Sequence, residues 1–319
     1  MSAAQSGPCS GPCVGTHPNG RGLLQSGPVG SPVTQFLSSW TFDPLLAAGM
    51  VAAALAYLAG VRRVRRRWPA ARWPRSRTVW WLLGLAVAWF VTLGPIGAYD
   101  DVFFWSHMVQ HLALMMLAAP LLMLAAPVTL LLRAMRPGAG RRRIQRILHG
   151  RVVRFLAHPV VAAALYLGTL AGVHFTSFYE TALEHPLIHT YVEHPLFLCA
   201  GMLFYWSIIG VDPGPRRSPY PVRLGILLVM MPLESFVGLA IYSAHRVLYP
   251  FYLHVDRPFG PGPIADQQLG GSLMLITAML VGVVWLAVAA RGWYRHEQIA
   301  AAHLDRRLDA ERSLSTGSA

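Results

Sequence analysis

Two histidines four residues apart, His107 and His111, are the strongest candidates in this sequence for metal or haem chemistry. On a helix this spacing places both side chains on one face, one turn apart. A pair of imidazoles in that arrangement can bind a transition metal or the iron of a haem. The chain that follows them is almost wholly apolar up to Pro127, and this run is long enough to enter a bilayer. We therefore predict a membrane helix with a ligand pair near one end.

The composition of the chain is typical of a polytopic membrane protein. Of its 319 residues, 54% are hydrophobic and 13% are charged, with a mean hydropathy of +0.43, whereas a soluble domain carries about 25% charged residues. The net charge of +13 comes from arginines that lie between apolar runs. That distribution indicates membrane topology, and it argues against a nucleic-acid surface. Cys9, Cys13 and Cys199 are too few for a disulfide framework.

Seven apolar runs predict an all-α bundle of about seven transmembrane helices. In chain order they are Leu45–Val61, Val79–Ile96, Val102–Leu124, Val160–Phe175, Leu196–Ile209, Leu224–Tyr242 and Leu269–Ala290. They define a membrane domain over 42–291. A Gly/Pro/Ser-rich tail over 1–41 precedes it and is expected to be disordered. A charged tail over 292–319 follows it.

The arginines predict the orientation of this bundle. Of the 27 basic residues, only Arg21, Arg246 and Arg257 fall on one side of the predicted membrane, and all the others fall on the opposite side. Cytoplasmic loops carry an excess of basic residues, so the arginine-rich side is expected to be cytoplasmic. The N-terminus is then outside and the C-terminus is cytoplasmic.

This orientation gathers eight of the 13 histidines at the outer end of the bundle, on four separate segments. They are His107, His111, His174, His185, His189, His194, His245 and His254. Seven carboxylates accompany them and could bind a metal or orient a ligating imidazole: Asp100, Asp101, Glu180, Glu184, Glu193, Asp256 and Asp266. A lone interfacial histidine is more often an amphipathic surface residue than a ligand. The pair on one helix argues for ligation, because an ionisable group in a membrane helix is costly and usually has a partner.

Other residues allow two interpretations. Met108, Met115, Met116 and Met123 could supply thioether ligands to Cu(I), although packing is the commoner role of methionine. Asp266 could be a ligand, or it could cap the last helix. Glu234, inside the sixth run, implies a buried partner or an ion role. The sequence contains no P-loop, GxSxG, HExxH or paired CxxC motif, so an ordinary hydrolase or transferase is not supported.

Three phrases of the sequence resemble the multi-spanning CtaG-type cytochrome c oxidase assembly factors of bacteria: SHMVQHLALMMLAAPLLMLAAP, the segment from His174 through EHPLFLCAGMLFYW, and DQQLGGSLM. The resemblance covers about Phe42 to Ala290. It implies a non-enzymatic role in maturing the copper-containing part of a haem–copper oxidase, in the bacterial cytoplasmic membrane. The implied partners are oxidase subunits and periplasmic copper chaperones, beside the lipid bilayer itself. The candidate metal ligands at matching positions are His107, His111, His174, His189, Glu193, His194 and Asp266.

The residues themselves leave four functions open. The first is an assembly factor that binds copper at the outer face and passes it on. The second is a copper-independent scaffold for oxidase subunits, with incidental histidines. The third is a redox protein whose haem is held by two of these histidines. The fourth is a copper permease that uses Glu234 deeper in the membrane. We rank the copper-handling assembly factor first.

Overall fold

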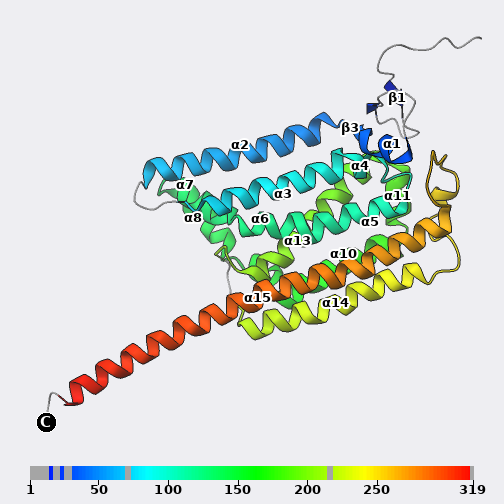
Figure 1. Ribbon diagram of the computed structural model, residues 1–319. Coiled ribbons are helices and arrows are strands. Elements are labelled where there is room, and N and C mark those ends of the chain that lie inside the picture. Colours follow the sequence, from blue (N-terminus) through cyan, green and yellow to red (C-terminus); the bar gives the residue numbers. More distant parts are fainter. Residues whose placement is uncertain (1–13, 17–21, 25–30, 69–72, 214–217, 317–319) are drawn as a thin grey trace, which may run out of the picture.

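The computed structural model describes residues 14–16, 22–24, 31–68, 73–213 and 218–316. Over these residues the chain is an all-α bundle whose long helices run along one common direction (Figure 1). The long helices are α2 (Pro44–Arg67), α3 (Arg75–Leu93), α10 (Pro159–Phe175), α13 (His194–Ile209), α14 (Tyr220–Tyr242) and α15 (Pro263–Thr316). A further span is built from α5 (Phe104–Ala113), a π-helical turn at Leu114–Ala118, α6 (Ala119–Leu124) and α7 (Pro127–Ala134).

Short elements connect these spans. They are α4 (Pro95–Ala98), α8 (Ala139–Leu148), α9 (Arg151–Leu156), α11 (Phe178–Glu184), α12 (Pro186–Ile188), a second π turn at His189–Glu193 and a 3₁₀ turn at Pro250–Leu253. By length and composition, six helices in the described part of the chain are able to cross a membrane. There are up to seven if α10 and α11, which meet at a bend of 64°, count as one span. The prediction of an all-α polytopic membrane bundle of about seven spans is confirmed.

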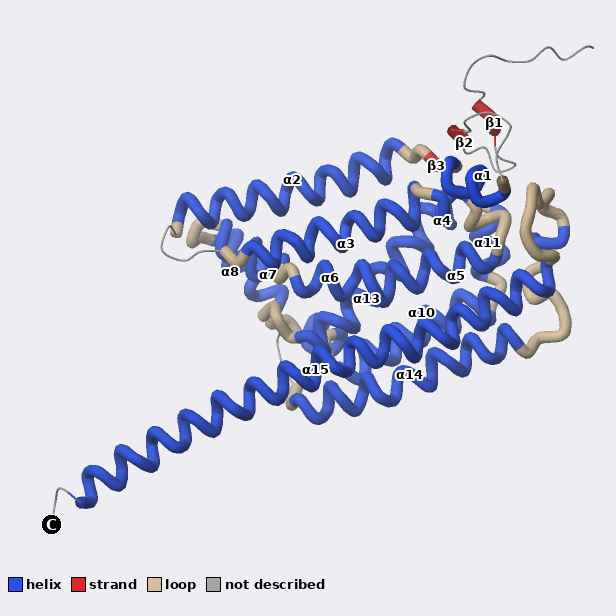
Figure 2. The backbone as a smooth tube through the Cα atoms, in the orientation of Figure 1, coloured by secondary structure: helices blue, strands red, loops and turns tan. Residues whose placement is uncertain are grey.

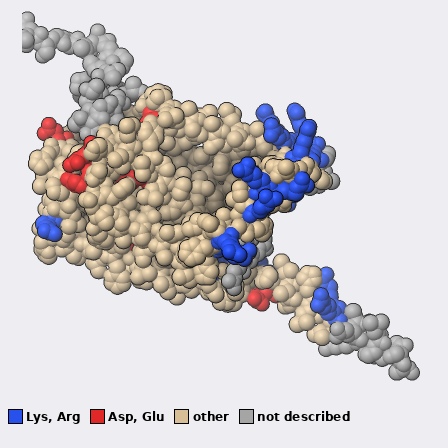
Figure 3. Space-filling model, turned by 180° about the vertical axis from the view of Figure 1, so that it is seen from behind, with Lys and Arg blue, Asp and Glu red and all other residues tan. Residues whose placement is uncertain are grey.

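The outward faces of the spans are apolar. Leu55, Leu228 and Leu280 are 61%, 59% and 65% exposed in the middle of their helices. Such side chains face lipid, because a water-facing helix places its polar residues outward. The charges are separated along the bundle: most visible arginines gather at one end and most visible acidic residues at the other (Figure 3).

The N-terminal segment differs in part from the expected disorder. Residues Val14–Thr16 (β1), Gly22–Leu24 (β2) and Trp40–Thr41 (β3) form a small antiparallel ribbon beside the bundle (Figure 2). Helix α1, Pro32–Ser38, is N-capped by Ser31. Its Phe36 ring stacks on Tyr99 at 5.4 Å. A good helix start and the packing of the partly buried Phe36 ring on Tyr99 therefore order residues 31–41, although their composition suggested a tail. The remaining tail, with Cys9 and Cys13, lies outside the described residues.

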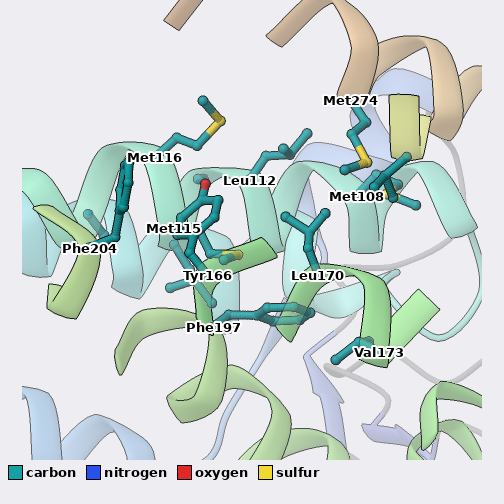
Figure 4. Close-up of a cluster of buried hydrophobic side chains, with 14 of the residues drawn as sticks. Met108, Leu112, Met115, Met116, Tyr166, Leu170, Val173, Phe197, Phe204 and Met274 are labelled. Atoms are coloured by element: carbon teal, nitrogen blue, oxygen red, sulfur yellow. The ribbon is translucent and has the colours of Figure 1, made fainter. Parts of the chain in front are cut away.

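The methionines that the sequence analysis considered as copper ligands lie in the core. Met115 and Met116 lie among Leu170, Phe197 and Phe204 (Figure 4), whereas the Sδ of Met108 contacts Nε2 of His111 at 3.0 Å. Packing is thus the role of Met115 and Met116, as methionine fills irregular gaps between helices.

Pro120 was expected to kink or end the third span, and the structure places a π turn directly before it. Proline has no N–H for the carbonyl four residues earlier and clashes with it, so the preceding turn widens. That carbonyl belongs to Met116, and the indole Nε1 of Trp285 on α15 donates a hydrogen bond to it at 2.9 Å. The helix therefore continues to Leu124, because a neighbouring helix supplies the missing donor.

Candidate metal centre

The histidine pair of α5 lies buried at the acidic end of the bundle, and both side chains are 0% exposed. Their ring centroids are 5.3 Å apart, as expected one turn apart on a single face. His174, at the end of α10, completes a first group, because one ligand nitrogen from each of the three rings lies within 4.8 Å of the others. The Nδ1–H of His174 donates to the carbonyl of Leu170 at 2.8 Å, so its Nε2 carries the lone pair.

A second group of three ligand atoms lies beside the first and combines Asp100, His189 and His194. The Oδ2 atom of Asp100 is 3.1 Å from Nε2 of His189 and 3.7 Å from Nε2 of His194. The same oxygen accepts a hydrogen bond from Nε2 of Gln110 at 2.7 Å. This arrangement holds a buried carboxylate in one orientation toward two imidazoles.

Glu193 connects the two groups. With His107 and His189 it forms a third set of ligand atoms within 4.8 Å of one another. Its Oε2 accepts the Nδ1–H of His189 at 2.5 Å, and its Oε1 is 3.9 Å from Nε2 of His107. A carboxylate that holds one ring nitrogen fixes which nitrogen faces a metal. Glu193 therefore directs Nε2 of His189 toward Asp100.

The second π turn explains how α13 presents its ligands. It runs from His189 to Glu193, and Pro195 follows in the first turn of α13. As at Pro120, proline cannot bond to the carbonyl one turn earlier, and the turn before it widens. The amide of His194 then bonds to the carbonyl of His189, five residues back. This widened turn places three potential ligands, His189, Glu193 and His194, at one level of the bundle.

Several buried ligand nitrogens in this cluster have no hydrogen-bond partner among the described residues. They are both ring nitrogens of His107, Nδ1 of His111 and Nε2 of His174. Purely structural buried histidines are normally hydrogen-bonded, since an unsatisfied buried polar atom costs about 1–3 kcal/mol. A metal ion would satisfy these lone pairs. Imidazole is a good ligand for copper. The Nε2–H of His111 donates to the Sδ of Met108 at 3.0 Å, which leaves Nδ1 of His111 as the ligand atom. The residues present therefore fit copper.

Two tyrosines, Tyr179 of α11 and Tyr252 of the 3₁₀ turn, lie beside the cluster. The ring of Tyr179 lies 4.2 Å from that of His107, and its hydroxyl is 2.6 Å from the hydroxyl of Tyr252. Tyr252 in turn donates to the backbone carbonyl of Asp100 at 2.8 Å, so Tyr179 is the donor between the two hydroxyls. Burial raises the pKa of Tyr252 well above its usual value, which keeps this hydroxyl protonated.

Asp266 is not brought into the cluster, although the sequence analysis counted it among the candidate ligands. Its carboxylate accepts the backbone N–H groups of Phe104 and Trp105 at 2.9 and 3.0 Å. It also accepts from the guanidinium of Arg257 at 2.8 Å. Asp266 thus caps the N-terminus of α5, which has no cap of its own, and it does not cap α15, in whose first turn it lies.

The rest of the DQQLGG phrase serves the same purpose. Gln267 bonds to the carbonyls of Ile241 and Arg246 and accepts the amide of Leu248 at 2.7 Å. A Cβ on Gly270 would meet the ring of Phe104 at 2.6 Å. The phrase therefore fixes α15 against α14 and α5, and through α5 it positions His107 and His111.

We expect Asp266→Asn to destabilise the protein by about 2 kcal/mol or more, because an amide cannot accept from two backbone donors and an arginine as a carboxylate does. The midpoint of thermal unfolding in detergent measures this loss. Asp256→Asn removes the same charge from an exposed position in the neighbouring loop and is the matched control. Equal unfolding midpoints for the two variants would contradict the capping role.

The structure separates the remaining candidate residues by their burial and contacts. Five of the eight histidines converge, and His185, His245 and His254 are exposed. Glu180 accepts the amide of Phe251 at 2.8 Å, so it anchors the loop. Glu234 is buried in α14 but belongs to none of the ligand groups among the described residues. The sequence analysis placed Asp100 among the accompanying carboxylates and not among the primary ligand candidates. Its position directly before the helix that carries His107 and His111 could have indicated a ligand role.

Comparison with known proteins gives a consistent result. Residues 55–296 match the family model described as cytochrome c oxidase caa3 assembly factor. An uncharacterised protein of Mycobacterium bovis is 36% identical over 286 residues, which are 88% of this chain, and one of Mycobacterium leprae is 34% identical over 87%. The chain spans 43% of the length of these relatives. No solved structure matches. By the match to that family model, over most of its length, this chain belongs to the caa3-type cytochrome c oxidase assembly factors.

Proposed function

We propose that this chain assists cytochrome c oxidase assembly by binding copper in the buried cluster and passing it to an oxidase subunit. The observation that carries this proposal is the convergence of five histidines and two carboxylates from four segments into one buried site. A scaffold with incidental histidines gives no reason for that convergence, or for imidazole nitrogens that lack hydrogen-bond partners in the described part of the chain. We propose no catalytic reaction.

The location of the site fits delivery from the outer face of the bacterial cytoplasmic membrane. The cluster lies at the end of the bundle opposite the arginines, and arginine-rich ends are normally cytoplasmic. Copper would then arrive from a periplasmic chaperone and leave toward the oxidase on the same side. The haem alternative is less well supported, because ligand nitrogens of three imidazoles lie within 4.8 Å of one another, whereas a haem iron offers two axial positions.

The decisive experiment measures copper in the oxidase of cells that lack this protein and carry either wild type or the double variant His107→Ala/His111→Ala. We expect copper content and oxidase activity to fall to the level of cells without the protein. His245→Ala/His254→Ala is the matched control, since both of its histidines are exposed at the same end. Immunoblots confirm equal amounts of each protein in the membrane. Normal oxidase copper in the first variant would refute the ligand role and favour the scaffold.

A further inference from the structure

We propose that the cluster is a centre with two metal positions of different chemical preference, a proposal that rests on the copper function above. The three groups of ligand atoms differ in which residues they share. The group of His107, His111 and His174 and the group of Asp100, His189 and His194 have no residue in common. Two ions can therefore be held at once without competing for a ligand.

The first position carries no charge of its own. Its three ligands are imidazoles, and the thioether of Met108 accepts the Nε2–H of His111 at 3.0 Å, which leaves Nδ1 of that ring to ligate. Neutral imidazole donors suit Cu(I). A monovalent ion also leaves the smallest uncompensated charge in a buried site, where the cost of an unpaired charge is high.

The second position is harder and negatively charged. Asp100 is itself a ligand candidate, and Glu193 bonds to Nδ1 of His189 at 2.5 Å. Two carboxylates next to two imidazoles compensate the charge of a divalent ion, and oxygen donors favour divalent over monovalent metals. Each position therefore has the donor type and the charge that match a different class of ion, a monovalent ion at the first and a divalent ion at the second.

The third group shows that the positions are adjacent. It takes His107 from the first position, His189 from the second, and adds Glu193. A Cu(I) ion that moved from one position to the other, with no change of oxidation state, could keep one imidazole at each step, first His189 and then His107. Such overlap suits a transfer protein, because an ion that changes ligands one at a time never crosses the apolar interior without a partner.

The test loads the purified full chain anaerobically with Cu(I) and then with Co(II), and counts both metals by elemental analysis. We expect one of each per chain. His111→Ala/His174→Ala should lose Cu(I) and keep Co(II), whereas Asp100→Ala/His194→Ala should lose Co(II) and keep Cu(I). The metal that each variant keeps is its own control for folding. If a double variant fails to accumulate, the single variants His174→Ala and His194→Ala replace it.

Two results would overturn the proposal. One is a single metal per chain in the wild type, whichever ion is offered. The other is loss of both metals together from a variant that remains folded by circular dichroism. In either case copper binding by the wild type would leave the proposed function standing. Failure of the wild type to bind any metal would remove both proposals.

Discussion

Replacing His107 with alanine is expected to weaken Cu(I) binding by at least ~100-fold, because substitutions of residues that only orient a ligand already cost 10–100-fold. His107 belongs to two of the three ligand groups, which no other residue of the first position does. Its loss therefore removes one of three imidazoles from that position and also the connection through Glu193. We expect a smaller loss for His174→Ala, which affects one group.

A competition titration against a coloured Cu(I) chelator measures these affinities. His254→Ala is the control, since that side chain is exposed and its Nδ1 bonds to the carbonyl of Pro250. Glu193→Gln tests the orienting role separately, because it retains the shape of the side chain and weakens its bond to His189. An unchanged Cu(I) affinity in His107→Ala would show that copper, if bound at all, is held elsewhere in the chain.

The sequence predicted the bundle well because the ability of a segment to span a bilayer depends mainly on the residues of that segment. A run of apolar residues that is long enough to span the membrane must be helical wherever it lies, since lipid leaves no other partner for the backbone. The arginines separated the two ends for a similar reason. Once the histidines were assigned to one end, five buried ligands were already among the candidates, although spacing could not reveal which of the eight turn inward.

What the sequence could not reveal depends on contacts between distant segments. Asp266 and the first turn of α5 are about 160 residues apart in the chain. The sequence alone therefore cannot distinguish a carboxylate that caps a distant helix from one that binds a metal. The π turns before Pro120 and Pro195 also depend on context, because proline more often kinks a helix, and here Trp285 compensates for the first of them. Asp100 became visible as a ligand only when His189 and His194 were placed beside it.

Replacing Gly271 with leucine is expected to cause the largest loss of stability, at least ~3 kcal/mol, at the upper end of what overpacking costs. A Cβ at this position would lie 2.6 Å from the amide nitrogen of Tyr242 and 2.8 Å from the carbonyl oxygen of Gly238. These are backbone atoms of α14, so no side chain can rotate away, and α15 must move from α14. Small residues at such crossings let membrane helices approach closely.

Gly225→Leu is the matched control, because a Cβ there has nothing within 4 Å and the position is exposed. The measurement is the unfolding midpoint in detergent, together with the fraction of protein extracted in monodisperse form. Equal behaviour of the two variants would refute the close packing of α14 on α15. The displacement also has a functional consequence, because α15 carries Asp266, which caps α5. Copper binding should therefore fall in Gly271→Leu although every ligand remains, since the helix that presents His107 and His111 loses its anchor.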